Sequence, residues 1–463
     1  MSTAGINLLY LATIVCFILA LRFLSSPATA RRGNQIGAVG MVIAIVATLL
    51  KAGVHLNWEM VVAALVGGTF GAVAARRVQM TAMPQMVALF NGVGGGAAAL
   101  VALAEFHELA PTSGRIHGDV SIAILLSALI GSISFSGSLI AFAKLQELIQ
   151  GRPITYTGQK LVNAALFLTL VGIGVAIVAG AEHQSLLWIV LAGALVFGVL
   201  FVLPIGGADM PVVISLLNAF TGLAAAATGF ELENNVLIVS GMLVGASGTL
   251  LTLMMGRAMN RSITNVLFGA FGQVTAGAAA AAAGDGGAVR SATADDVAVM
   301  LAYASKVVVV PGYGMAVAQA QHDVRALADI LEERGIEVTY AIHPVAGRMP
   351  GHMNVLLAEA NVPYPQLKEM DEANGEFSRT DVSLVIGAND VVNPDARNNP
   401  GSPIYGMPIL NVDQSQAIVV LKRSMNPGFA GIENPLFLNP KTVMLFGDAK
   451  ESVGKLAAAV KAL

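Results

Sequence analysis

The apolar positions of this chain follow two patterns, and the change lies near residue 260. The first part consists of long apolar runs separated by short polar stretches. A helix needs about 20 mostly apolar residues to cross a membrane, because lipid offers no partner for open backbone groups. We predict spanning helices at nine such runs: 4–24, 36–53, 58–75, 83–104, 119–143, 160–180, 185–204, 210–230 and 235–257.

The last third alternates short apolar runs with amphipathic stretches. Strands are predicted at 306–310, 337–342, 382–386, 417–421 and 442–446, with helices over 315–334 and 352–360. This alternation is typical of a parallel sheet with crossover helices. The predicted fold class is therefore a multi-span α-helical membrane bundle of about nine helices, followed by an α/β Rossmann-like parallel-sheet domain.

A segment without a core joins the two parts. Residues 275–289, TAGAAAAAAGDGGAV, carry almost no bulky side chain and cannot bury apolar surface. We therefore predict a transmembrane domain over 1–260, a linker over 261–289 and a nucleotide-binding domain over 290–463.

The distribution of charge supports this division. Residues 1–260 hold 11 Lys/Arg and 9 Asp/Glu, whereas 261–463 hold 15 and 20. The net charge of −3 gives no indication of nucleic-acid binding. Cys16 is the only cysteine, which excludes disulfides within the chain, cysteine-based zinc sites and iron–sulfur ligation.

Positive charge marks the cytoplasmic side of a membrane protein. If the N-terminus lies outside the cell, only two cations of the loops, Lys51 and Arg115, also lie outside. The other nine lie on the cytoplasmic side: Arg22, Arg31, Arg32, Arg76, Arg77, Lys144, Arg152, Lys160 and Arg257. The C-terminal domain is then cytoplasmic, and Glu231-Leu-Glu233 forms an external turn. As an alternative, Ala28-Thr29-Ala30 resembles a signal-peptide cleavage site, but no positive region precedes the first apolar run.

The most informative motif of the last third is Gly312-Tyr-Gly314-Met-Ala-Val-Ala318, which follows four valines. Glycine at its first two positions lets the backbone approach a pyrophosphate, and the following helix directs free N–H groups at the anion. The context favours dinucleotide binding. The alternative is a strand–helix turn that needs glycine only for packing.

The choice of dinucleotide depends on the ends of two strands. NAD-selective folds place an acid at the end of the second strand, where this chain has His343-Pro344. Lys422-Arg423-Ser424, at the end of a later strand, supplies cations and a hydroxyl suited to a 2′-phosphate. This favours NADP. The alternative for Lys422 and Arg423 is a solvated surface pair.

Two further loops contain residues suited to a ligand site. The run 343–352 mixes Pro and Gly with Arg348, which could lie over a pyrophosphate. Gly387-Ala-Asn389-Asp390 follows a buried strand, at an edge where open α/β sheets bind ligands. His343 and His352 do not have the spacing of metal ligands, and we expect them to fix the loop by hydrogen bonds.

Polar residues deep in a membrane bundle are costly and are candidates for function. Asn91, Asn163 and Asn218 are predicted at depth, with Ser132, Ser134 and Ser136, and Asp209 begins a helix. No histidine falls in a predicted span, which argues against haem held between helices. Interhelical hydrogen bonding is the alternative role for the asparagines. Glycines such as Gly67, Gly68 and Gly94–Gly96 are expected to allow close helix packing.

Long motif runs of this chain resemble the β subunit of proton-translocating NAD(P) transhydrogenase. They are Gly206–Pro211, Pro311–Ala320, His343–Asn354, Gly387–Asp390, Lys422–Asn426 and Gly447–Ala449. The resemblance implies hydride transfer from NADH to NADP⁺ coupled to inward proton movement. It also implies a bacterial inner membrane, an NAD(H)-binding α subunit as partner, and a homodimeric membrane core.

The resemblance also assigns roles to particular residues, and no side chain acts as a catalyst in the hydride step. Asn91, Asp209, Asn218 and Arg261 match positions of the proton path and its coupling. Some members carry histidine where this chain has Asn91, so we expect a chain of water molecules in place of a protonatable relay. The positions assigned to NADP(H) are Gly312, Tyr313, Gly314, Met315, Ala316, Val317, Ala318, Gly347, Arg348, Met349, Gly387, Asn389, Asp390, Lys422, Arg423, Ser424, Gly447, Asp448 and Ala449.

Two other classes of protein share the two-part layout. A channel or transporter with a regulatory nucleotide domain is one, but no TVGYG-like filter occurs in the sequence. A membrane electron-transfer reductase is the other, and the distribution of histidines argues against its haem. Copurification of an NAD-binding subunit would distinguish the transhydrogenase from both.

Overall fold

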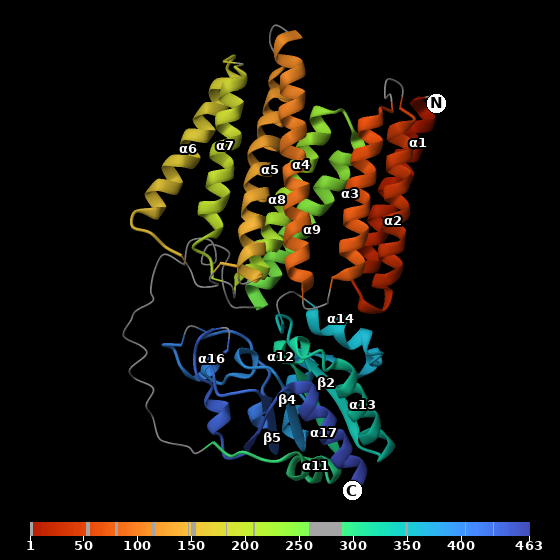
Figure 1. The fold of residues 1–463 in the computed structure, drawn as a ribbon, viewed down its shortest axis with the longest axis vertical. Helices are drawn as coiled ribbons and strands as arrows, with labels where there is room; N and C mark the ends of the chain where they lie inside the picture. Colours follow the sequence, from red (N-terminus) through yellow and green to blue (C-terminus); the bar gives the residue numbers. More distant parts are fainter. Residues whose placement is uncertain are drawn as a thin grey trace. The chain divides into compact units, whose positions relative to one another are not determined.

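The computed structural model describes residues 3–51, 56–78, 82–112, 116–146, 148–149, 154–181, 183–206, 209–258, 289–347, 351–402, 404–428 and 430–463. The chain divides into two compact units, Met1–Leu253 and Met254–Leu463. The first unit is helical and the second contains the sheet (Figure 1).

Within the described ranges, nine helices are long and apolar enough to cross a membrane, as the apolar runs predict. They are α1 (Thr3–Leu24), α2 (Pro27–Leu49), α3 (Trp58–Arg77), α4 (Met83–Thr112), α5 (Gly118–Leu145), α6 (Gln159–Val178), α7 (Gln184–Val202), α8 (Met210–Glu231) and α9 (Asn235–Ala258). The largest difference from prediction is α2, which begins nine residues before the expected 36. Proline is favoured at the first helical position, and Pro27 begins this helix.

Helix α5 is the centre of the helical unit. It packs against α4, α7 and α8, and about two thirds of its most apolar window is buried. A Cβ added at Gly131 of α5 would lie 2.5 Å from the Gly95 carbonyl oxygen of α4. The packing role predicted for the glycines is thus confirmed at Gly95. It is wrong for Gly67 and Gly68 within this chain, since they face open space on α3.

The second unit is built on a six-stranded parallel sheet in the order β3-β2-β1-β4-β5-β6. Its strands are β1 (Lys306–Pro311), β2 (Glu337–Ile342), β3 (Leu367–Glu369), β4 (Val382–Ile386), β5 (Ala417–Lys422) and β6 (Thr442–Phe446). The strand order reverses between β1 and β4, and this is the doubly wound, Rossmann-like arrangement. Open sheets of this type bind ligands outside the carboxyl ends of the strands at that reversal.

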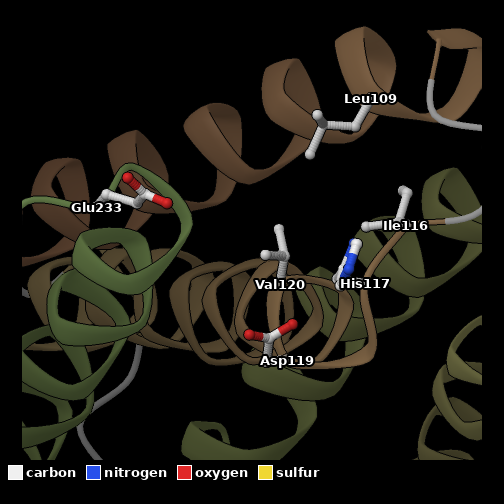
Figure 2. A pocket seen from close by; sticks show the side chains of 6 residues that line it. All are labelled: Leu109, Ile116, His117, Asp119, Val120 and Glu233. Atoms are coloured by element: carbon white, nitrogen blue, oxygen red, sulfur yellow. The ribbon is translucent and has the colours of Figure 1, made fainter.

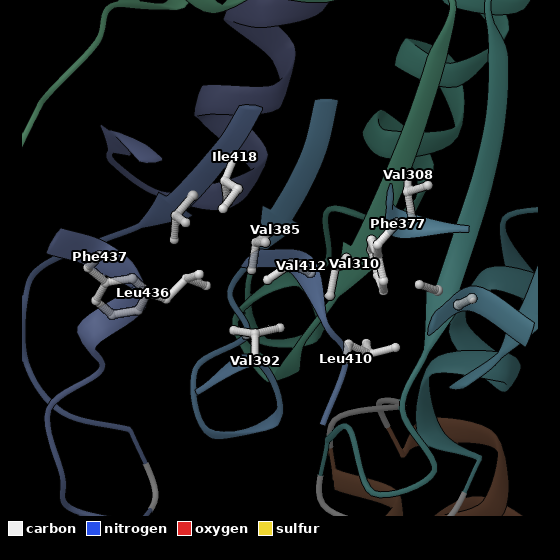
Figure 3. Packing of buried hydrophobic residues seen from close by; sticks show 14 of the residues in the cluster. Val308, Val310, Phe377, Val385, Val392, Leu410, Val412, Ile418, Leu436 and Phe437 are labelled. Atoms are coloured by element: carbon white, nitrogen blue, oxygen red, sulfur yellow. The ribbon is translucent and has the colours of Figure 1, made fainter. Parts of the chain in front are cut away.

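Both faces of the sheet are covered, so its strands are continuous apolar runs. On one face, α11 (Ala294–Ala302) and α13 (Gln321–Glu333) pack against α17 (Ala449–Ala462). On the other face, Val308 and Val310 of β1 belong to one buried cluster with Phe377, Leu410 and Leu436 from loops and short helices (Figure 3). Alternate residues of β1 thus supply the two cores.

Two elements differ from the predicted pattern. The helix predicted over 315–334 is divided into α12 (Tyr313–Val317) and α13, because Gln319 takes a left-handed conformation with φ of +50° between them. Strand β3 was not predicted. It has only three residues, Leu-Lys-Glu, and none of them is fully buried, so it lacks both the length and the apolar pattern of a strand.

Candidate functional site

The turn after β1 packs against the turn after β4, and this contact requires glycine. The Gly312 N–H donates to the Ile386 carbonyl at 2.9 Å, and the Gly314 N–H donates to the Gly387 carbonyl at 2.9 Å. A Cβ added at Gly312 would lie 2.4 Å from the Ala388 backbone, and one at Gly314 would lie 2.7 Å from Gly387 Cα. The glycines of the fingerprint therefore have a packing role of their own. The contact joins two predicted ligand loops at the carboxyl edge.

The side chains of α12 mostly hold the turn in place. Met315 and Ala316 are fully buried, so their side chains pack inside the fold. Val317 and Ala318 are more open, and the Tyr313 ring lies 6.4 Å from the His352 ring, between centroids. The N–H groups of Gly312, Gly314 and Met315 donate to the carbonyl groups of Ile386, Gly387 and Gly312, so most main-chain donors of the turn are engaged within the fold.

His343, at the end of β2, fixes its loop as predicted. Its Nδ1 accepts a hydrogen bond from the Val345 N–H at 3.2 Å, so Nε2 carries the proton and donates to the Pro408 carbonyl at 2.8 Å. Burial lowers the pKa of His343, and the bond to Pro408 partly offsets this. With both ring nitrogens engaged by the backbone, His343 cannot replace the acid that contacts a ribose in NAD-selective folds.

The following loop is shaped around a buried histidine. Gly347 has φ of +98°, and a Cβ there would lie 2.3 Å from His352 Nδ1. His352 itself is only 1% exposed and begins α14 (His352–Glu359). Arg348 and Met349, which were predicted to cover a nucleotide, lie outside the described residues.

The loop after β4 is held by hydrogen bonds from a segment that is distant in the sequence. The Asp390 carboxylate accepts the Ala430 N–H at 2.9 Å, and the Asn434 amide donates to the Asn389 carbonyl at 3.0 Å. A Cβ at Gly428 would lie 2.6 Å from Asp390 Oδ1. Residues 428–434 were not predicted to belong to the site. Their Gly and Asn-Pro content indicates turns, but nothing in the sequence indicates which loop they contact.

Lys422 is the anchored cation of the site. Its ammonium donates to the Asn426 carbonyl and lies 5.0 Å from the centre of the Phe437 ring. Burial lowers the pKa of Lys422, whereas the negative charge of Asp390 acts to raise it. Arg423 and Ser424 are exposed beside it. The alternative of a solvated surface pair therefore does not describe Lys422, although it remains open for Arg423.

The turn after β6 meets the same edge. The Gly447 N–H donates to the Lys422 carbonyl at 3.1 Å, and a Cβ at Gly447 would lie 2.5 Å from the Ser452 hydroxyl. Asp448 caps α17 by accepting the Lys450 N–H at 3.0 Å, and Ala449 begins that helix. The predicted loops after β1, β4, β5 and β6 are thus placed side by side at the carboxyl edge.

The helical unit contains a buried polar cluster around Asn91. The Asn91 amide of α4 donates to the Ser138 hydroxyl of α5 at 2.9 Å and lies 3.4 Å from the Ser134 hydroxyl. Ser134 in turn pairs with Thr221 of α8 at 2.6 Å. The interhelical role considered for Asn91 is therefore present, and its Oδ1 atom has no partner among the described residues.

The other predicted coupling residues lie near the start of α8. Asp209 is 9% exposed and precedes that helix, whereas Asn218 is half-buried and makes no side-chain hydrogen bond to a described residue. Arg261 lies outside the described residues. Lys144, which was predicted in a loop, is buried at the end of α5, and its ammonium donates to the Leu203 and Ile205 carbonyls.

These features define a class of protein: a multi-pass membrane bundle joined to a Rossmann-like unit with a glycine turn and a fixed cation at its carboxyl edge. In the portions described, no group of three or more His, Cys, Asp or Glu side chains could hold a metal ion.

Comparison with known proteins places the chain within this class. The family model described as NAD(P) transhydrogenase beta subunit matches residues 6–459. Two relatives, from Rhodospirillum rubrum and from its strain ATCC 11170, are both named NAD(P) transhydrogenase subunit beta. Each is 50% identical over 456 residues, which cover 97% of this chain and 98% of the relative. The chain belongs to the NAD(P) transhydrogenase beta subunit family and is thus a subunit of a membrane-bound oxidoreductase.

Proposed function

We propose that this chain binds NADP(H) at the carboxyl edge of its sheet and couples hydride transfer between NADH and NADP⁺ to proton translocation through its helical unit. The observation that carries the assignment of NADP(H) is the pairing of Lys422 with a β2 end that has no acid. A 2′-phosphate needs cationic donors, and His343 at the end of β2 is fully engaged by the backbone.

The sheet order suggests how the nucleotide lies. The pyrophosphate meets the β1 turn at Gly312 and Gly314, while the 2′-phosphate meets Lys422, Arg423 and Ser424 at the end of β5. Since β5 and β2 lie on opposite sides of β1, the adenosine half extends over β4 and β5. In the usual NAD-selective arrangement it extends toward β2.

The second nucleotide, NAD(H), binds to a partner subunit. The sequence carries one glycine fingerprint of this kind, so NAD(H) binds on a separate α subunit, and a homodimeric helical core holds two copies of the chain. Hydride passes directly between the two nicotinamides, and no side chain acts as nucleophile or base. The protein positions the rings and adjusts the affinity for NADP(H).

Proton movement supplies the driving force. In a bacterial inner membrane, with the N-terminus outside and the α/β unit cytoplasmic, protons move inward through the bundle. One charge crossing 100 mV is worth about 2.3 kcal/mol, which shifts a balanced exchange by more than tenfold, since about 1.4 kcal/mol is a factor of ten. Asn91, Asp209, Asn218 and Arg261 belong to the path and its coupling.

The experiment for the nucleotide assignment is calorimetric titration of the purified chain with NADP⁺ and with NAD⁺. We expect tighter binding of NADP⁺, and we expect Lys422→Ala with Arg423→Ala to weaken it by about 100-fold or more, because each charged hydrogen bond contributes about 1.5–3 kcal/mol. NAD⁺ binding should stay as it was.

The matched control is Lys455→Ala with Lys461→Ala, which removes the same charge from exposed positions on α17. NADP⁺ affinity in this control should equal that of the unmodified chain. Unchanged NADP⁺ affinity in the Lys422/Arg423 variant would remove these residues from the site.

A further inference from the structure

Glu231 is a buried acid at the end of α8 opposite Asp209. It is the last residue of that helix, about 33 Å from Asp209 at about 1.5 Å per residue. Although the sequence places it in a predicted external turn, the residue is only 6% exposed. No described side chain makes a well-formed hydrogen bond to its carboxylate oxygens, although the Ser127 hydroxyl lies within reach of them.

The surroundings of Glu231 make a permanent negative charge costly. An unpaired charge removed from water loses several kcal/mol of solvation, on the order of what a small domain has as total stability. The C-terminal end of a helix adds a partial negative charge beside it. Glu105 of α4 lies within electrostatic reach, with Glu108 close to it. A glutamine would meet none of these costs, so a purely structural role does not account for an acid here.

Hydroxyl groups lead from Glu231 into the bundle. Thr228, three residues earlier on α8, pairs with Ser127 of α5 at 2.6 Å, and the Ser127 hydroxyl also acts on the Glu231 carboxyl group. Ser134 and Thr221 form a second pair, also at 2.6 Å. Ser134 is seven residues after Ser127 on α5, and Thr221 is seven residues before Thr228 on α8. The two pairs therefore lie on the same faces of these helices, two turns or roughly 10 Å apart.

Beside this end of α8 lies a hollow with polar groups. It has a volume of about 310 Å³ and lies between the end of α4, the start of α5 and the turn after α8 (Figure 2). Apolar side chains alternate in its lining with His117, Asp119 and Glu233. Glu233, which lines the hollow, is two residues beyond Glu231 in the chain.

We propose that Glu231 is the proton-exchanging acid at this end of the bundle, taking protons from water in the hollow and releasing them to the Ser127–Thr228 pair. The O–H bond of the carboxyl group forms as a hydronium ion gives up its proton. It breaks as the proton moves to a hydroxyl oxygen that releases its own proton onward, and no electron is transferred. This inference rests on the proposed proton translocation.

Other titratable groups also face this region. Glu105, Glu108 and His107 lie on α4, and His107 pairs with Gln184 of α7 at 2.7 Å. His117 and Asp119 lie at the start of α5, and Glu233 lies on the turn after α8. Since all of them can affect a pH profile, the test must separate Glu231 from its neighbours.

The test uses the complex with its α subunit in proteoliposomes. Glu231→Gln keeps the size of the side chain and removes its proton, and we expect it to slow proton pumping about 100-fold, the range of a lost acid–base group. Hydride exchange between nucleotides that are already bound should be unchanged. Glu231→Asp should restore part of the pumping with a displaced pH profile, and difference infrared spectra should lose a protonated-carboxyl band only in Glu231→Gln.

Glu59→Gln is the matched control. It neutralises an exposed acid in the first turn of α3, at the same end of the bundle, and it should pump as the unmodified complex does. Pumping by Glu231→Gln at the unmodified rate would overturn the inference, and so would a parallel loss of pumping and exchange, which indicates a structural role. Failure of the unmodified complex to pump would instead overturn the proposed function.

Discussion

At the scale of single residues, the site depends on how Lys422 is held. The Phe437 ring, the Asn426 carbonyl and the Asp390 charge all act on one ammonium group. The sequence predicts the cation but not these partners, because Phe437 and Asp390 come from segments far apart in the chain. The same is true of Glu231, whose sequence neighbourhood resembles an exposed turn and whose burial depends on α4 and α5.

The titration of Lys422 gives a pH prediction. Burial lowers its pKa below the ordinary 10.5, with Asp390 opposing, so its charge is lost at lower pH than that of an exposed lysine. The charged form is needed to hold a 2′-phosphate, and NADP⁺ affinity should therefore fall as pH rises through this lowered pKa. Calorimetric titration over a series of alkaline pH values measures the effect.

Lys422→Arg is the control for this pH dependence. A guanidinium stays protonated throughout the accessible range, with a pKa above about 12, so the alkaline loss of affinity should disappear. An identical alkaline loss in Lys422→Arg would mean that another group titrates.

At the scale of elements, the turns after β1 and β4 form one unit. The close backbone contact between the two turns explains why Gly312, Gly314 and Gly387 are glycines. This agrees with the alternative considered for the fingerprint, a turn that needs glycine for packing, and a ligand could still bind there. The sequence predicts β4 and β6 with their observed bounds, since both are short apolar runs between turn residues. It does not predict the contact of Gly314 with Gly387, because that depends on the order of the strands.

Alanine substitutions at two glycines can separate the effect of backbone strain from the effect of the contact between the two turns. Gly387 and Gly335 both have left-handed φ angles, +66° and +81°, but only Gly387 faces another backbone, and Gly335 faces open space. Gly387→Ala should destabilise the α/β unit by about 1–3 kcal/mol more than Gly335→Ala, the usual cost of overpacking. Scanning calorimetry measures the difference. We expect NADP⁺ affinity to fall only in Gly387→Ala, and equal effects of both substitutions would contradict the proposed role of the contact.

At the scale of the whole molecule, the chain joins two units of different solvent preference. The apolar runs predict the helices well because membrane length and lipid set a strong constraint. The apolar runs predict the start of α2 poorly. Arg31 and Arg32 near its beginning are typical of a loop, but in the structure both lie exposed on the helix.

The α/β unit has its own sheet and its own cores, so residues 290–463 should fold without the helices. This fragment includes Ala292, whose N–H donates to the Met444 carbonyl at 2.9 Å, and the capping box of α11 at Thr293. We expect native-like circular dichroism and NADP⁺ affinity equal to that of the intact chain. An unfolded fragment without nucleotide binding would show that the predicted boundary at 289 is wrong.

We propose that proton movement through this chain drives hydride transfer to NADP⁺. This is tested by measuring the rate and final extent of NADP⁺ reduction by NADH in proteoliposomes of the complex, with and without an imposed inward proton gradient. We predict a shift of the final nucleotide ratio by more than tenfold for about 100 mV, lost with a protonophore. Asp209→Asn should lose the shift while bound nucleotides still exchange hydride. An equal rate and extent with and without the gradient in the unmodified complex would show that proton movement does not drive the reaction.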